Sequence, residues 1–368
     1  MTLSERLDAA IEASLVDRIV GCVILVNRDG KPVYRRGAGL TDREANRPME
    51  ADTIFRLASV TKPIVATAVL RLCERGEIAL DDPVTKFLPW FTPTLADGTV
   101  PVIRIRELLT HTSGLTYDLP DTIAQGPIGP VISLEENLRR LAALPLAFEP
   151  GTKWAYGMSL DVLGGVLAVI NGSDLQAALD RHVFAPLGIR DMRFVVADTA
   201  RLTTQYGDGP QGSLPVRMGD PHTVQRADGF SMTVSPGRIL DPDAPQSGGA
   251  GLSGTADDVM TVLDTYQTGA LLKPETIRMA LSNQIGEVPR VPGEAFSFIG
   301  ALSTDPGAAK APWPAGTVAW GGGWGHNWFL DPVNRLTVLT CTNTMFEGLG
   351  GKIRFDVIKA IYAGRLDI

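Results

Sequence analysis

Ser59 is the only serine in the chain that has a lysine three residues after it, in the run FRLASVTKP at residues 55–63. Two residues three apart lie on one face of a helix, so the Ser59 hydroxyl and the Lys62 amine can meet at its first turn. A base beside a hydroxyl makes that hydroxyl a possible nucleophile. Residues 64–72 are apolar on nearly every side, as expected of a helix buried at a domain centre. A Ser-x-x-Lys spacing alone often arises by chance, and the predicted buried helix after it strengthens the interpretation of Ser59 as a nucleophile.

A serine–lysine pair needs a third group, because the proton taken from the hydroxyl must later reach the leaving group. Tyr156 is the candidate, in the run EPGTKWAYGMSLDVLG at residues 149–164. There a proline-glycine turn leads through an aromatic pair into an apolar helix, and such a loop can direct a phenol into a cleft. A nearby ammonium favours the ionised phenol, so Lys62 would make Tyr156 a usable general base. Alone, such a tyrosine is more often a packed surface residue.

A glycine-rich run, VAWGGGWGH at residues 318–326, is the third candidate element. Glycine weakens a strand, and its usual reason is that something approaches the backbone closely. An acyl group bound along Trp320, Gly321 and Gly322 would approach in this way. An amide of this strand and the amide of Ser59 could form an oxyanion hole, which is typically worth about 10²–10³ in rate per donor. The alternative is a bulge at a sheet edge.

Other patterns carry weaker interpretations. Residues 249–254 spell GxGxxG, but the preceding LDPDAP is a loop, which disfavours dinucleotide binding. His326 invites a Ser-His interpretation, yet the chain has no Gly-x-Ser-x-Gly elbow, so we interpret His326 as a pocket residue or a support behind the pocket. Trp154 and Trp324 line the acyl pocket or pack in the core. The other histidines and the three cysteines lack metal spacing, and we expect no metal site: His111, His182, His222, Cys22, Cys73 and Cys341.

The composition limits the function without deciding it. The chain has 368 residues, 44% hydrophobic and 20% charged, enough for one large domain or two closely joined lobes. A formal net charge of -7 argues against nucleic acid or an anionic membrane as the main partner. The first residues form no charged-then-apolar leader, and the longest apolar stretch, residues 162–170, is too short to span a bilayer. We therefore expect a cytoplasmic protein with neither partner.

The two ends of the chain have mirrored patterns. Apolar residues recur at helical spacing from residue 7 to residue 19, and residues 21–26 and 32–35 then flank the turn NRDG like a hairpin. Near the other end, residues 328–330 and 336–342 flank the turn DPVNR, and residues 353–362 follow as a predicted helix. Strands from both ends, covered by terminal helices, indicate one antiparallel sheet that the chain leaves and rejoins.

The middle of the chain is predicted to form an inserted, mostly helical lobe. It is rich in proline and glycine loops, and its helical segments include residues 134–144 and 160–170. The predicted organisation is therefore an α/β (α+β) sheet lobe from residues 1–84 and 251–368, with residues 85–250 as the helical lobe. The candidate residues come from both lobes, so the active site would lie between them.

The candidate motifs resemble those of one superfamily. Ser-x-x-Lys at Ser59, Pro-Gly-Thr-x-Trp-x-Tyr ending at Tyr156 and Trp-Gly-Gly at Trp320 occur in the order found in serine β-lactamases and penicillin-binding proteins. LLTHTSGL at 108–115 and GLSGTADD at 251–258 look like two further blocks. The likeness spans roughly residues 20–345. It is closest to the class C-like branch and, within it, to the family VIII carboxylesterases, which carry Trp-Gly-Gly where lactamases carry Lys-Thr-Gly.

The resemblance implies a β-lactamase-like fold and a role for each motif residue. Ser59 would be the acylated nucleophile, and Lys62 and Tyr156 would share its proton. Gly323, which follows Trp-Gly-Gly, would complete the oxyanion hole with the amide of Ser59.

Two positions depart from the family pattern. Met158 stands where the family has an asparagine after the tyrosine, and Trp320 stands where a cationic residue usually opens the third motif. In a β-lactamase these polar groups hold the amide and the carboxylate of the substrate. Their replacement predicts an apolar, uncharged cleft that favours neutral esters over penicillins.

The sequence thus predicts a serine carboxylesterase that hydrolyses small to medium neutral esters through an acyl-enzyme, without a metal or organic cofactor. A β-lactamase- or DD-peptidase-like amidase, or an acyltransferase, is the alternative, because all of these reactions share the acyl-enzyme. A catalytically inactive binding protein of the same fold is a further alternative. The presence of Ser59, Lys62 and Tyr156 together argues against it.

Overall fold

The centre of the molecule is an eight-stranded antiparallel sheet built from both ends of the chain. The computed structural model describes residues 1–209, 213–225 and 231–364. The strand order is β10-β11-β12-β13-β14-β1-β2-β3, and β1 pairs with β14 from Cys22 opposite Thr342 to Arg28 opposite Leu336. The strands are β1 (Gly21–Arg28), β2 (Lys31–Asp42), β3 (Arg47–Pro48), β10 (Glu294–Phe296), β11 (Ala301–Ser303), β12 (Val318–Gly322), β13 (His326–Asp331) and β14 (Leu336–Thr342). This arrangement confirms the predicted antiparallel sheet.

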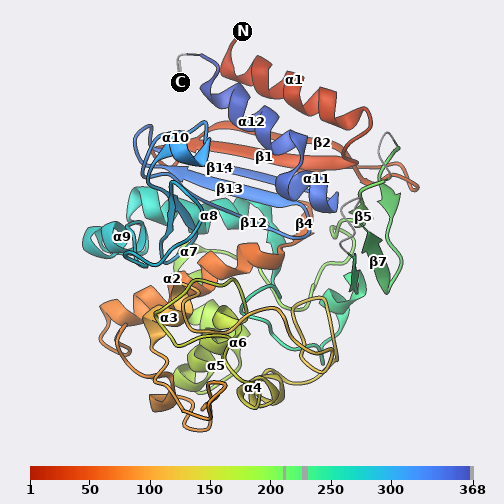
Figure 1. Ribbon diagram of the computed structural model, residues 1–368. Coiled ribbons are helices and arrows are strands. Elements are labelled where there is room, and N and C mark those ends of the chain that lie inside the picture. The colour runs from red at the N-terminus through yellow and green to blue at the C-terminus, as the bar shows by residue number, and fades with distance from the viewer. Residues whose placement is uncertain (210–212, 226–230, 365–368) are drawn as a thin grey trace.

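Helices cover both faces of this sheet. Helices α1 (Leu3–Leu15) and α12 (Lys352–Tyr362) pack against each other on one face, and α8 (Ala256–Thr268) packs against β1 and β14 on the opposite face (Figure 1). A capping box between Thr2 and Glu5 begins α1. The helix ends at Leu15, earlier than the apolar spacing predicts, but Ile19 is still buried. The terminal helices therefore cover the sheet as predicted.

A second group of helices lies on the side of α2 (Thr61–Glu74) that faces away from the sheet (Figure 1). Its members are α3 (Ile105–Leu109), α4 (Leu134–Ala142), α5 (Ser159–Asn171) and α6 (Leu175–Leu179). A π-helical turn (Asp180–Phe184) follows α6, contacts α2 and leads into α7 (Ala185–Leu187). One hydrophobic cluster runs from Val23 and Leu25 of the sheet through α2 to Leu163 and Val166 of α5. The sheet and this helical region therefore share a continuous core, and the predicted lobe boundaries at 84/85 and 250/251 stay a prediction.

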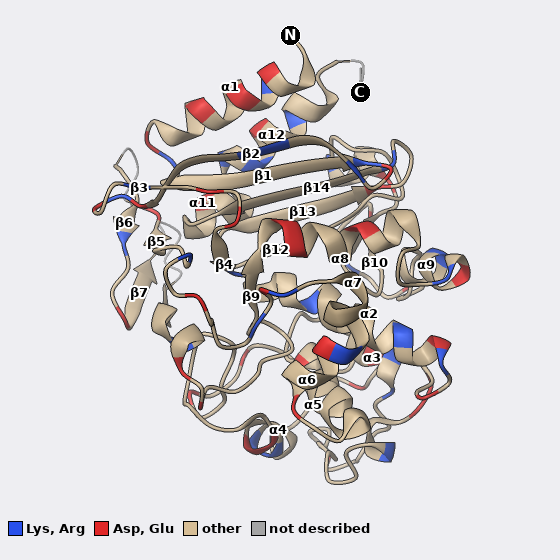
Figure 2. Cartoon of the chain, turned by 180° about the vertical axis from the view of Figure 1, so that it is seen from behind, with Lys and Arg blue, Asp and Glu red and all other residues tan. Residues whose placement is uncertain are grey.

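Short elements complete the chain. They are β4 (Ile54–Arg56) paired with β9 (Ser253–Thr255), β5 (Tyr206–Gly207) with β6 (Val216–Arg217), β7 (His222–Gln225) with β8 (Ser231–Val234), α9 (Pro274–Ala280), α10 (Pro306–Ala309), α11 (Met345–Gly350) and the 3₁₀ turns Ala58–Val60, Val84–Lys86 and Pro236–Leu240. Lys and Arg are interspersed with Asp and Glu along the chain, for example on α1, α4 and α9 (Figure 2). In the described ranges, no single helix has both the length and the apolar character needed to cross a bilayer; by length and composition alone, α5 and residues 175–187 could do so as a pair bent by 78°.

Candidate active site

The candidate nucleophile lies in a strained turn at the start of the central helix. Ser59 is the middle residue of the 3₁₀ turn Ala58–Val60, which runs directly into α2. Ala58 has φ 45°, a left-handed conformation that costs free energy for a residue with a side chain. The strand pair β4–β9 and the hydrogen bond from the Leu57 amide to the Leu252 carbonyl (2.8 Å) hold the preceding segment. The surrounding structure thus fixes the position of the Ser59 hydroxyl.

Two side chains predicted from the sequence contact this hydroxyl. Lys62 Nζ donates a hydrogen bond to Ser59 Oγ at 3.1 Å, and the Tyr156 hydroxyl donates to the same oxygen at 2.6 Å. The Lys62 ammonium lies 4.5 Å from the centroid of the Tyr156 ring, and Lys62 is only 4% exposed. Ser59 therefore has two proton-carrying partners, one of them a buried cation.

Lys62 has two more partners that the sequence analysis did not identify. Its Nζ donates to the Tyr117 hydroxyl at 3.0 Å and to the Gly249 carbonyl at 2.7 Å. Burial, together with Tyr156 and Asp161, raises the pKa of Tyr117 well above its usual value, so this phenol stays protonated. Tyr117 lies two residues after the block at 108–115, and Gly249 two residues before the block at 251–258. Their position beside these two blocks is the sequence signal that could have identified Tyr117 and Gly249.

A buried carboxylate lies behind the lysine. Asp161, in the first turn of α5, accepts a hydrogen bond from the Ser247 hydroxyl at 2.5 Å and is 1% exposed. Burial raises the pKa of Asp161, while the Ser247 hydroxyl and the charge of Lys62 act against that rise. The Asp161 carboxylate therefore adds a compensating group near the buried ammonium.

The glycine-rich strand packs directly against the nucleophile's own segment. A Cβ on Gly322 would lie 2.3 Å from the Leu57 carbonyl oxygen and 3.1 Å from Val60 Cγ2, so a side chain fits only if strand and turn move apart. A Cβ on Gly323 would meet no atom within 4 Å. The sequence predicted a close approach to this strand but assigned it to an acyl group. The structure shows that, at Gly322, it is the backbone just before Ser59 that approaches.

Aromatic rings enclose the tyrosine. The ring centroids of Tyr156 and Trp320 are 5.1 Å apart, and Phe296 packs edge-on against Trp320 at 5.4 Å. Trp320 Nε1 also donates to the Tyr156 hydroxyl at 3.4 Å. His111 packs against Tyr156 at 4.8 Å, and its burial and the charge of Lys62 hold its pKa well below the usual value. His111 is therefore a neutral ring in this aromatic cage; it lies within the block at 108–115, but the sequence analysis assigned it no role in the site.

The cavity at Ser59 has a volume of about 470 Å³. Of the predicted site residues, it is lined by Ser59, Tyr156, Trp320, Gly321 and Gly323.

Charged side chains of three further residues, Arg290, Glu294 and Arg354, also form its wall. The expectation of an uncharged cleft is therefore wrong. The cause is that these residues come from the loop before β10, from β10 and from α12, outside every motif.

Five predicted pocket residues do not line this cavity: Gly322, which packs against the turn before Ser59, and Met158, Trp154, Trp324 and His326. Met158 is fully buried, and Trp154 packs against Phe296 at 5.5 Å behind the wall. Trp324 packs with Val224 and Val234 in a separate cluster.

His326 is also directed away from Ser59. His326 Nε2 bonds to the Arg56 carbonyl at 2.6 Å, and burial lowers the pKa of His326 to about 4. Met158, Trp154, Trp324 and His326 therefore support the walls of the site or its surroundings.

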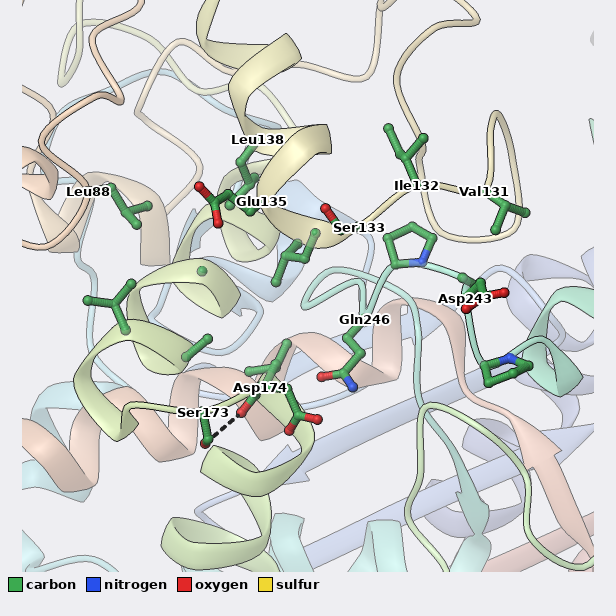
Figure 3. A pocket seen from close by; sticks show the side chains of 18 of the residues that line it. Leu88, Val131, Ile132, Ser133, Glu135, Leu138, Ser173, Asp174, Asp243 and Gln246 are labelled. Atoms are coloured by element: carbon green, nitrogen blue, oxygen red, sulfur yellow. Dashed lines mark hydrogen bonds between the residues drawn. The ribbon is translucent and has the colours of Figure 1, made fainter.

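A larger cavity, of about 960 Å³, lies away from this chemistry. It is formed by α4, α5 and the loop at 242–246, and it includes Leu88, Leu138, Asp174 and Gln246 (Figure 3). None of the predicted site residues lines it. In the described ranges, no group of three or more His, Cys, Asp or Glu side chains is placed to hold a metal ion. The smaller cavity, which contains Ser59, is therefore the candidate active site.

The fold and this site define the class of the protein. A family model described as Beta-lactamase matches residues 7–363, nearly the whole chain. The chain belongs to this family, which confirms the resemblance drawn from the motifs.

Two relatives are similar over almost their full length. Esterase EstB of Burkholderia gladioli is 46% identical over 98% of this chain and 96% of its own. The solved structure of EstCE1, described as a hydrolase with promiscuous acyltransferase activity, superposes with a TM-score of 0.93 at 38% identity, covering 98% of both chains. A more distant relative, monacolin J acid methylbutanoyltransferase of Aspergillus terreus, is 28% identical over 93% of this chain and 90% of its own.

Proposed function

We propose that this protein is a serine carboxylesterase that hydrolyses small to medium carboxylic esters through an acyl-enzyme on Ser59. The enzyme class follows from the family and from the 46% identity to an esterase over the full chain. The residue assignment rests on one observation, the contact of Ser59 Oγ with both Lys62 Nζ and the Tyr156 hydroxyl. The size range rests on the cavity of about 470 Å³.

In the proposed acylation step, Ser59 Oγ attacks the ester carbonyl while its proton passes to the Lys62–Tyr156 pair in its deprotonated form. The negative charge that develops on the carbonyl oxygen is held by the amides of Ser59 and Gly323. Collapse of the tetrahedral intermediate breaks the bond to the alcohol oxygen, which takes the proton back from the pair. Water then attacks the acyl-enzyme by the same sequence, releasing the acid and restoring Ser59.

The aromatic surroundings support an ester rather than a strongly polar substrate near the reacting carbonyl. Trp320 and Tyr156 line the cavity beside Ser59, and Phe296 backs Trp320. Rings of this kind bind the apolar part of a small ester and reduce the access of water to the catalytic pair. Neutral esters therefore remain within the proposed range.

Acyl transfer is the second candidate function. It is favoured by two similar proteins, one described as a hydrolase with promiscuous acyltransferase activity and one named as a methylbutanoyltransferase. Both functions use the same acyl-enzyme, and they differ only in whether water or an alcohol accepts the acyl group.

One experiment tests both candidates. Wild-type protein is incubated with 4-nitrophenyl butyrate, with and without an added primary alcohol, and the released nitrophenol, butyrate and alkyl butyrate are quantified. An esterase releases butyrate equal to nitrophenol, whereas an acyltransferase diverts most butyrate to the alcohol at low alcohol concentration. The absence of nitrophenol release by the folded protein would contradict both and favour an inactive binding protein.

A further inference from the structure

The larger cavity, of about 960 Å³, has a size suited to a small molecule. Its floor is apolar, because Leu88, Leu138 and Leu175 line it and are each buried (Figure 3). At its edge, Val131 and Val169 are 48% and 52% exposed. Apolar side chains that gather around a hollow and stay open to water indicate a binding site.

The charged side chains around this cavity have one sign. Its lining contains Glu135, Asp174 and Asp243 and, among the described residues, no lysine, arginine or histidine. Glu135 forms an ion pair with Arg139 at 2.6 Å, so its charge is compensated. Asp174 uses one carboxylate oxygen to accept the Ala177 amide at 2.8 Å, and the Asp243 carboxylate has no hydrogen bond or ion pair within the described part of the chain. Two negative charges are therefore available to a ligand.

The loop that closes this cavity continues into the groups that hold Lys62. Gln246 lines the cavity, and the next residue, Ser247, donates a hydrogen bond to Asp161 at 2.5 Å. Three residues after Gln246, the Gly249 carbonyl accepts a hydrogen bond from Lys62 Nζ at 2.7 Å. A displacement of the loop at the cavity would therefore reach the partners of this lysine within three residues.

Helix α5 is the second element that the cavity shares with the site. Ala168 of this helix lines the cavity. The helix and the loop are in close contact, since a Cβ on Gly248 would lie 2.3 Å from the Leu160 carbonyl oxygen. Closely packed elements transmit a displacement to each other instead of absorbing it. A molecule wedged between α5 and the loop at 242–246 therefore shifts the groups that position Lys62.

We propose that this cavity is an effector site for a small cation with an apolar chain, and that a molecule bound there slows hydrolysis at Ser59. The apolar floor binds the chain, and the carboxylates of Asp174 and Asp243 attract the positive head. In Figure 3 these two side chains lie on either side of Gln246, in the loop that continues toward Lys62. The effect on hydrolysis rests on the proposed esterase function, whereas the binding does not.

The binding test compares octyltrimethylammonium, octyl methyl sulfoxide and octanesulfonate, which share an octyl chain and differ in charge. Each is used below its micellar concentration, and none has a hydroxyl or amine that could accept an acyl group. In calorimetric titration, the Kd of the cation should be roughly 3- to 10-fold lower than that of the sulfoxide, because two exposed carboxylates each contribute a modest attraction. The sulfonate should bind most weakly. The cation should also raise the melting temperature, as a ligand of the folded state does.

The kinetic test uses 4-nitrophenyl butyrate as the substrate. Saturating octyltrimethylammonium should lower kcat by roughly 3- to 10-fold with little change in KM, because a small displacement of a catalytic group lowers the rate steeply. Competition with the ester at Ser59 would instead raise KM and leave kcat unchanged.

Variants assign the binding to this cavity. The double variant Asp174→Asn/Asp243→Asn should bring the Kd of the cation to that of the sulfoxide, and asparagine at position 174 still caps α6. Val169→Lys places a positive charge at the cavity edge and should abolish both the preference for the cation and its effect on kcat. The matched controls are Asp17→Asn and Val16→Lys, since both residues are exposed just after α1 and do not line the cavity; they should behave as wild type.

The outcomes separate the inference from the esterase function. Equal Kd values for the three probes, no binding of the cation, or a preference that persists in these variants overturns the site. Inhibition that raises KM alone, or saturation of binding without a change in kcat, overturns the effector role and leaves the esterase standing. The absence of ester turnover contradicts the esterase itself, and calorimetry then decides the binding site alone. If one variant does not fold, the other and its control decide.

Discussion

At the residue scale, the account depends on how the proton leaves Ser59. Lys62 and Tyr156 each contact Ser59 Oγ, so we expect Lys62→Ala and Tyr156→Phe to lower kcat/KM by at least roughly 10²-fold each, the usual effect of losing a general acid-base group. Because the pair acts as one unit, the double variant should lose far less than the product of the single losses. Steady-state kinetics with 4-nitrophenyl butyrate measures this, with Tyr34→Phe as the control, since that hydroxyl bonds to Asp8 outside the site. An active Tyr156→Phe variant would remove Tyr156 from the mechanism.

His326 gives a second prediction at this scale, on stability. Burial lowers its folded-state pKa to about 4, whereas an unfolded histidine titrates near 6.5. Between these values the unfolded chain binds the proton and the folded chain does not, so the free energy of unfolding falls as the pH drops from about 6.5 to 4. The His326 contribution should be about 2 kcal/mol between pH 8 and pH 5.

Denaturant unfolding of wild type and His326→Gln at pH 8 and pH 5 measures this contribution. His111 is also buried with a lowered pKa, so only the difference between the two proteins isolates His326. The same variant should keep its esterase activity at neutral pH, because His326 bonds to the Arg56 carbonyl rather than to Ser59. Equal pH dependence in both proteins would contradict the burial argument, and loss of activity with intact stability would revive the Ser-His interpretation.

At the scale of elements, the closest packing around the site is between β12 and the turn that carries Ser59. Gly322→Ala would place a methyl group 2.3 Å from the Leu57 carbonyl oxygen, so strand and turn must separate. We expect this variant to lose about 1–3 kcal/mol of stability, the usual cost of overpacking, and to lower kcat more than it raises KM. Gly323→Ala is the stability control, because a Cβ there meets open space.

Thermal unfolding and steady-state kinetics on these two variants test the packing. Equal melting temperatures for Gly322→Ala and wild type would show that β12 does not press on the turn. The sequence could indicate that some group approaches the backbone of this strand closely, because a close approach is the usual reason for glycines inside a strand. It could not name Leu57 as the approaching group, since the contact joins segments more than 260 residues apart.

At the scale of the whole molecule, the predicted features are those that local patterns encode. Hairpin turns and terminal helices at both chain ends predicted the antiparallel sheet, and the structure confirms it through the pairing of β1 with β14. The order of motifs predicted the Beta-lactamase family, which the family model confirms. The contact of Ser59 with Lys62 follows from helical spacing, whereas that of Ser59 with Tyr156 was inferred from the loop that carries the tyrosine and then from the family resemblance.

The site residues that could not be predicted from the sequence come from segments that only the fold brings together. Tyr117, Asp161, Arg290 and Arg354 reach the site region from four separate segments, and none has a motif spacing relative to Ser59. Met158 occupies a family motif position and His326 ends the glycine-rich run, but the start of α5 and the pairing of β13 direct both side chains into the core. A position in or beside a motif therefore did not by itself predict that the side chain lines the cavity.

The central claim is that Ser59 is the residue that becomes acylated. Intact-mass spectrometry and peptide mapping after exposure to a fluorophosphonate, with ester turnover on the same samples, test it most directly. The account predicts one adduct on the peptide that contains Ser59, no adduct on folded Ser59→Ala, and a loss of turnover in that variant on the order of 10⁶-fold. Ser282→Ala, an exposed serine after α9, should behave as wild type. An adduct on another residue, or a Ser59→Ala variant that keeps more than a few per cent of ester hydrolysis, would contradict the account.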